Sequence, residues 1–128
     1  MLTIKTVLEA HDALVNLIKN DKELGYEIPK QARLTLAQNL NLAIPVAEAF
    51  SKVHNALVAK YGTTDKQGNL NVTDKDKKDA FFLERTNELE QESTVEAFTP
   101  VKLSDFPGNV HVDLIALMLR TNMIDINS

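Results

Sequence analysis

The stretch LAQNLNLAIPVAEAFSKVHNALVAKYG, from Leu36 to Gly62, is the strongest helical pattern in this chain. Its apolar positions recur at alternating steps of four and three residues, the repeat of a helix that packs one side against a neighbour. A second apolar row widens the stripe, which favours a globular helical bundle over a free two-stranded coiled coil. We call the main row the seam, and it comprises Leu36, Leu40, Ala43, Ala47, Phe50, His54, Leu57 and Tyr61.

Pro45 lies in the middle of this pattern. Because proline has no N–H, it leaves the carbonyl of Asn41 without its helical partner, at a cost of about 3 kcal/mol in a straight helix. Two outcomes are physical: the helix bends and continues, or it breaks before Pro45, since the residue preceding a proline disfavours the α conformation. The seam keeps its phase on both sides of Pro45. The sequence therefore predicts a kink between Asn41 and Pro45 and not a loop.

Start and stop signals place the first two helices. An apolar stripe predicts a first helix from about Thr3 to Lys19, with Thr3 as its cap and Gly25 in the following turn. The long helix is expected to begin near Pro29, because proline is well tolerated in a first turn. Gly62 is expected to end it.

Two further helices are predicted in the second half of the chain. The third begins at Thr73 or Asp74 and ends near Gln91, and its narrow apolar stripe of Phe82, Thr86 and Leu89 places it on the outside. The last, VDLIALMLR, begins at Asn109 or Asp113. Because it is apolar on nearly every side, we expect it to be the most buried helix.

Two segments have β character. The residues Leu70–Val72 form a strand of a small hairpin or lie in an exposed loop. The region Val95–Leu103 alternates apolar and polar residues but contains Pro100, so it is predicted as an edge strand or two short strands, with the strand near Leu70 as its expected partner. The terminal NMIDINS either frays or adds one more extended piece. The expected fold of residues 1–128 is a single mainly α domain, a small helical bundle with a long Pro-kinked helix and a minor β-hairpin or edge strand.

Composition excludes several classes of protein. The chain of 128 residues has no cysteine, so it holds no disulfide, thiolate nucleophile or Cys-based metal site. Its four glycines are not clustered, so phosphate-binding glycine loops are absent. A net charge of −4 disfavours a nonspecific nucleic-acid binder. The sequence has no run of about 18 apolar residues, so no membrane-spanning helix is expected. Charged residues near the start argue against a signal peptide.

The three histidines are the first candidates for chemistry. His11 and His54 fall on the apolar stripes of the first and second helices, so they could meet in the bundle interior, and His111 precedes the last helix. Two readings stay open: hydrogen-bonded core or boundary histidines, or a pair that acts as a pH switch or metal ligand. No zinc-type spacing supports the second reading.

Glu84, Glu88 and Glu92 lie four residues apart on the third helix. Paired carboxylates of this kind serve acid–base chemistry or di-metal sites, but the Glu-x-x-His element of di-iron bundles is absent. The row is therefore predicted to be a solvated face or a surface for a basic partner. We predict no catalytic, cofactor-binding or metal-binding residue, and hence no enzyme and no cofactor.

Three segments of the C-terminal two-thirds follow a recognisable order. The long helix closes in AKYGTTDKQGN, an acidic helix reads FFLERTNELEQES, and an extended VEAFTPVKLSDF leads to the last apolar helix. From about Ala47 to Leu119 this order resembles that of small proteins of unknown function encoded by tailed bacteriophages, often near morphogenesis genes. The resemblance implies a phage context, in the host cytoplasm or the virion, and it brings no established active-site residues.

The functional expectation is a non-enzymatic phage protein that acts through protein–protein contact, as a virion structural or assembly component. The seam and the three glutamates are its candidate interaction surfaces, with another protein or a second copy as partner. The competing reading of the seam is that it forms the core of the monomer. One alternative is a phage-encoded inhibitor or modulator of a host protein, bound through the acidic face. Another is a nucleic-acid accessory protein that gathers five lysines into one patch: Lys60, Lys66, Lys75, Lys77 and Lys78.

Overall fold

A computed structural model describes residues 1–127 of the chain. Its helices are α1 (Ile4–Leu24), α2 (Lys30–Tyr61), α3 (Lys75–Leu89) and α4 (Val112–Arg120), with a short 3-10 turn, η1, at Leu103–Asp105. The strands are two residues each: β1 (Thr63–Thr64), β2 (Leu70–Asn71), β3 (Val101–Lys102) and β4 (Ile124–Asp125). The expected mainly α fold with a minor β component is confirmed.

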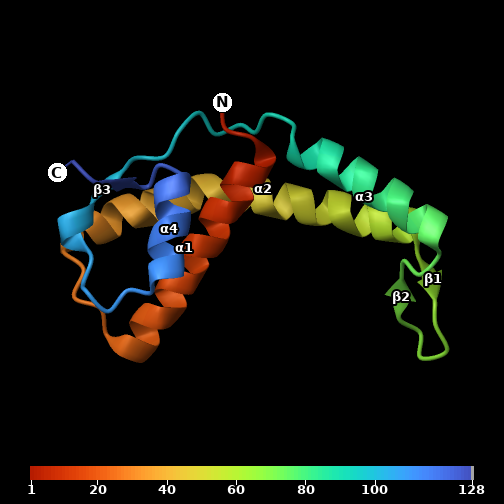
Figure 1. Cartoon of the computed structure of the whole chain (residues 1–128), viewed down its shortest axis with the longest axis horizontal. Helices are drawn as coiled ribbons and strands as arrows, with labels where there is room; N and C mark the ends of the chain where they lie inside the picture. The colour runs from red at the N-terminus through yellow and green to blue at the C-terminus, as the bar shows by residue number, and fades with distance from the viewer. Residues whose placement is uncertain (128) are drawn as a thin grey trace.

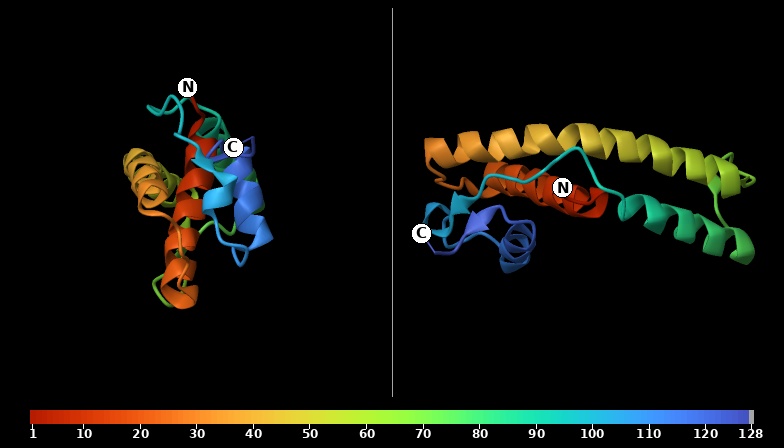
Figure 2. Two further views of the ribbon diagram at one scale, coloured as in Figure 1. Left: turned by 90° about the vertical axis from the view of Figure 1, so that its left-hand side faces the viewer. Right: turned by 90° about the horizontal axis from the view of Figure 1, so that it is seen from above.

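The described chain is elongated, because α2 runs along its whole length (Figure 1). Seen from above, α1 lies beneath the N-terminal half of α2 and α3 lies beneath its C-terminal half (Figure 2). We call α1, the N-terminal half of α2, α4, β3 and β4 the head. We call the C-terminal half of α2, α3 and the β1–β2 hairpin the arm.

Local signals fix the ends of α1 and α2. The side chain of Thr3 accepts a hydrogen bond from the Thr6 N–H and so caps α1, as predicted. Gly25 ends α1 in the left-handed conformation with φ 65°, which glycine adopts without steric cost. Gly62 follows α2 with an extended backbone, and a Cβ at this position would collide with the carbonyl of Val58 and the side chain of Leu70. Helix α1 extends five residues beyond the expected Lys19.

Helix α2 passes Pro45 without a loop, so the prediction of a continuous helix is confirmed. The helix bends gently near its middle (Figures 1 and 2). Asn41 and Pro45 are both exposed, so the Asn41 carbonyl that loses its helical partner can bond to water. This placement keeps the cost of the internal proline low.

A hairpin at the far end of the arm reverses the chain. Strands β1 and β2 pair antiparallel with Thr64 opposite Leu70. The Asp65 carboxylate accepts hydrogen bonds from the N–H groups of Gln67 and Asn69 and so holds the turn. Asp74 then caps α3 by accepting from the Lys77 N–H. The predicted hairpin and one of the two proposed caps are thereby confirmed.

The second pair of strands corrects the expected pairing. Strand β3 pairs in parallel with β4, with Val101 opposite Ile124, and not with the strand at Leu70. Leu70 lies at the tip of the arm, whereas β3 follows a segment that returns along α2 to the head (Figure 1). The terminal segment was expected either to fray or to add an extended piece, and β4 is that extended piece.

Two predictions of helix burial are also corrected. On α3 the buried aromatic is Phe81, while Phe82 is 58% exposed, because adjacent helical residues point about 100° apart and only one faces α2. Helix α4 is not the most buried helix: it buries Leu114 and Met118 against α1, while Val112 is 73% exposed. Its cap is His111, whose Nδ1 accepts from the Asp113 N–H at 3.1 Å.

The hydrophobic core lies in the head. There α1 is packed between α2 and α4 (Figure 2). Its buried side chains belong to the same core cluster as Val95 and Phe98, which lie in the segment before β3. The largest fully buried side chains include Leu14, Met118 and Met123. The buried side chains of the arm, Phe50, Leu57 and Phe81, lie outside this core cluster.

Candidate functional site

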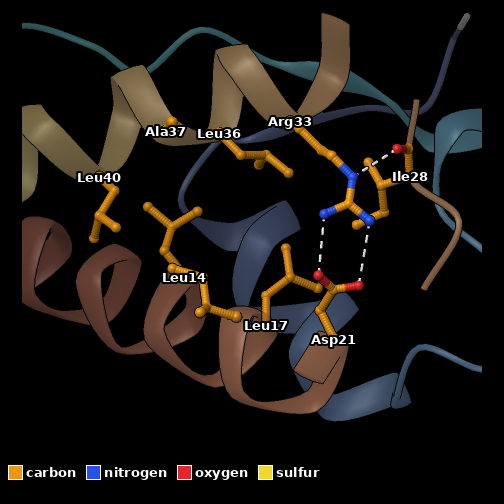
Figure 3. A pocket seen from close by; sticks show the side chains of 9 residues that line it. Leu14, Leu17, Asp21, Ile28, Arg33, Leu36, Ala37 and Leu40 are labelled. Carbon is orange, nitrogen blue, oxygen red and sulfur yellow. Dashed lines mark hydrogen bonds and ion pairs between the residues drawn. The ribbon is translucent and has the colours of Figure 1, made fainter. Parts of the chain in front are cut away.

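A small apolar pocket opens between α1 and α2 (Figure 3). Its volume is about 150 Å³, and leucines from both helices converge on it. This volume suits one apolar side chain and is below the roughly 300–1,000 Å³ of ordinary small-molecule sites. The lining residues are Leu14, Leu17, Ile18, Asp21, Ile28, Arg33, Leu36, Ala37 and Leu40.

Arg33 closes one end of this pocket and fixes the turn between α1 and α2 (Figure 3). Its guanidinium donates to both oxygens of Asp21 at 3.0 and 3.3 Å, to the Ile28 carbonyl at 2.8 Å and to the Tyr26 carbonyl at 2.6 Å. The hydrogen bond from Arg33 lowers the pKa of Asp21. With four donors engaged by the protein itself, Arg33 acts as a structural clamp, and the pocket presents no reactive group.

A second polar group ties α2 to α3 near the tip of the arm. The carboxylate of Glu84 accepts hydrogen bonds from the Tyr61 hydroxyl at 2.6 Å and the Lys60 ammonium at 2.9 Å. These bonds, that of Tyr61 first, lower the pKa of Glu84, and the carboxylate raises the pKa of Lys60. Glu84 and Lys60, which were predicted to belong to an acidic face and a lysine patch, therefore form a solvent-exposed ion pair with each other across the arm.

The histidines have separate surroundings. The Nδ1 of His11 lies 3.6 Å from a carboxylate oxygen of Asp12, and His111 caps α4. His54 lies in the arm, with its ring 5.7 Å from that of Phe81 and 6.5 Å from that of Phe50. Its Nδ1 is buried and has no hydrogen-bond partner among residues 1–127. The expected meeting of His11 and His54 is thus replaced by an aromatic cluster around His54 alone.

The predicted seam lies inside the chain. Leu36, Ala43, Phe50 and Leu57 are buried, and the other four members are half-buried. These side chains pack against α1 in the head and α3 in the arm. The seam therefore belongs to the interior of the chain itself, the second of the two alternatives considered for it. Glu88 and Glu92 line a mostly apolar groove of about 290 Å³ at the root of the arm, beside Pro45 and Phe50.

Sequence reasoning missed a buried polar clamp in the head. Asn39 is 1% exposed, and its side-chain amide donates to the Thr99 carbonyl at 2.8 Å while its oxygen accepts from the Thr99 N–H at 3.0 Å. Asn39 thereby fixes the segment that leads into β3 against α2. The signal was present, because a polar residue three positions after Leu36 and four before Ala43 falls within the apolar stripe.

The outer face of α3 carries exposed apolar side chains. Phe82 is 58% exposed and Leu83 is 63% exposed, at the centre of the helix. The chain as a whole exposes 8298 Å², whereas a compact monomer of 14.3 kDa is expected to expose about 6,800 Å². The excess of about 1,500 Å² arises from the elongated shape with its two-helix arm.

The described helices include none with the length and apolar character needed to cross a membrane. Comparison of the chain with protein-family models, curated proteins and solved structures found no match.

Proposed function

We propose that this chain is a non-enzymatic protein that works by binding a protein surface with its arm, as a structural or assembly component of a phage virion. The phage setting rests on the sequence resemblance. One observation supports the binding role: two large apolar side chains of the arm, Phe82 and Leu83, are exposed side by side on α3.

The arm has few stabilising contacts of its own. It consists of the C-terminal half of α2, α3 and a hairpin whose two strands have two residues each, with Phe50, Leu57 and Phe81 as its buried side chains. Short helices depend on tertiary packing of their apolar faces for most of their stability, and an isolated two-stranded hairpin is marginal in water. An additional surface packed against α3 supplies the burial that the arm lacks.

The surface excess has the size that a partner requires. A standard protein–protein interface covers about 800 Å² on each partner, and the excess is about 1,500 Å². One interface of ordinary size on the arm would cover about half of this excess.

Hydrogen exchange combined with light scattering tests the proposal. In dilute solution the amides of α3 should exchange much faster than those of α1, and association with a partner or a second copy should slow them selectively. The amides of α1 serve as the internal control. A strictly monomeric chain whose α3 amides are as protected as those of α1 would show that the arm needs no partner.

A further inference from the structure

We propose that a second copy of this chain docks on the arm, with the two α3 helices antiparallel across a two-fold axis between Phe82 and Leu83. This inference rests on the proposed binding role of the arm and names its partner. It follows from a symmetry in the spacing of exposed residues on α3.

Five exposed residues of α3 and Glu90, the residue that follows its last turn, form an outer face on the side away from α2. Successive helical residues are rotated by about 100°, so these six fall within an arc of about 100°, while Phe81 points inward. Their spacings of four, three, one, three and four read the same in both directions. The residues are Lys75, Asp79, Phe82, Leu83, Thr86 and Glu90.

An antiparallel pair turns this palindrome into three complementary contacts, each made twice. Phe82 of one copy meets Leu83 of the other at the centre, which covers the most exposed apolar side chains of the arm. Asp79 lies opposite Thr86, a carboxylate acceptor facing a hydroxyl donor. Lys75 lies opposite Glu90, so opposite charges meet at both ends of the interface.

The charges along α3 select this direction. Residues 74 to 79 contain three lysines and three aspartates and are neutral in sum, whereas residues 84 to 92 contain four glutamates and one arginine and carry −3. A parallel pair would place the two acidic ends side by side. The antiparallel pair places each acidic end beside the neutral end of the partner, which avoids this repulsion.

The helix dipole supplies a second argument. The last turn of α3 contains no basic residue, although the negative end of the dipole favours one there. A local preference that a sequence contradicts often reflects a functional requirement. In the antiparallel pair, Lys75 of the second copy lies opposite Glu90 and so places one positive charge near this end.

A charge exchange tests the pairing of Lys75 with Glu90. Lys75→Glu alone and Glu90→Lys alone should each raise the dissociation constant of the dimer about tenfold or more, because each replaces two attractive contacts by two repulsive ones. The double variant should restore association. Within one chain the two positions are about 22 Å apart, too far to compensate each other. Both single changes also improve the match with the helix dipole, so weakened association cannot be assigned to an unfolded helix.

Engineered cysteines test the register. Because the chain has no cysteine, single variants Asp79→Cys and Thr86→Cys introduce the sole thiols. Under oxidation a mixture of the two should give mainly the mixed 79–86 disulfide dimer, and Gln38→Cys, on the head, should give none. Predominant 79–79 and 86–86 dimers would overturn the antiparallel arrangement.

The result separates this inference from the proposed function. A dimer that Leu83→Glu dissociates, but Leu34→Glu in the head does not, supports both. A dimer without the mixed disulfide and without rescue by the charge exchange overturns only the arrangement. If the chain is a monomer whose α3 amides exchange rapidly, the second copy is not the partner, but the proposed binding role of the arm stands. If the chain is a monomer whose α3 amides are protected, both the pairing and the binding role are overturned.

Discussion

Removing the Asn39 side chain gives the sharpest test of how the head is held together. Asn39→Ala deletes both hydrogen bonds to the backbone of Thr99. The side chain is almost completely buried, so water cannot replace its contacts without opening the space between α2 and the segment before β3. The segment should then detach from α2, and with it the pairing of β3 with β4.

The expected loss can be estimated from the two bonds. A hydrogen bond contributes about 1 kcal/mol net, and leaving buried partners unsatisfied adds to the loss. We therefore expect Asn39→Ala to lower the free energy of unfolding by about 2–3 kcal/mol, a large part of the total of about 5–15 kcal/mol. For 128 residues this corresponds to a fall in Tm of about 7–11 °C.

Urea and thermal unfolding at one fixed protein concentration measure the loss, because association changes apparent stability. Asn55→Ala, an exposed site on the same helix, controls for the gain in helix propensity. Asn39→Leu keeps the volume but makes neither hydrogen bond, so it should be destabilised by a similar amount. A stability of Asn39→Leu within about 0.5 kcal/mol of the native chain would refute the hydrogen-bond argument.

Two further predictions concern the arm. The pKa of Glu84 in the folded chain is lowered from the ordinary 4.5. Its contribution to the free energy of unfolding is therefore fully present above pH 4.5 and is lost as the pH falls through the folded pKa. Glu84→Gln should therefore flatten the fall in Tm between neutral and acid pH, whereas exposed Glu96→Gln should not, and an unchanged slope would exclude a stabilising role for this carboxylate. His54→Leu removes a buried nitrogen without a partner among the described residues, so it should raise the free energy of unfolding by about 1 kcal/mol. A thermal melt showing destabilisation would mean that His54 has a partner in solution.

The ends of the helices were predictable because they depend on local chemistry. Thr3, Gly25, Gly62 and Asp74 satisfy or end backbone hydrogen bonding within a few residues, so their roles could be assigned from sequence. The continuity of α2 through Pro45 was predictable for a related reason: the phase of the seam on both sides requires one helix.

The candidate site was less predictable, because it depends on which faces are covered. The sequence offered the seam and the glutamate row as surfaces, but the structure places the seam inside the chain and bonds Glu84 to Lys60 and Tyr61. The exposed face of α3 was missed because Phe81 and Phe82 are adjacent and equally apolar. Only the position of α2 decides which of them is buried.

The sequence by itself determined the number of helices, most of their ends and the absence of cysteine chemistry, since these follow from local hydrogen bonding and composition. Tertiary structure alone decided that β3 pairs with β4, that Asn39 clamps Thr99, and that α4 leaves Val112 exposed. The physical reason is that these contacts join residues far apart in the chain. Periodicity identifies an apolar face, but only packing determines what covers it.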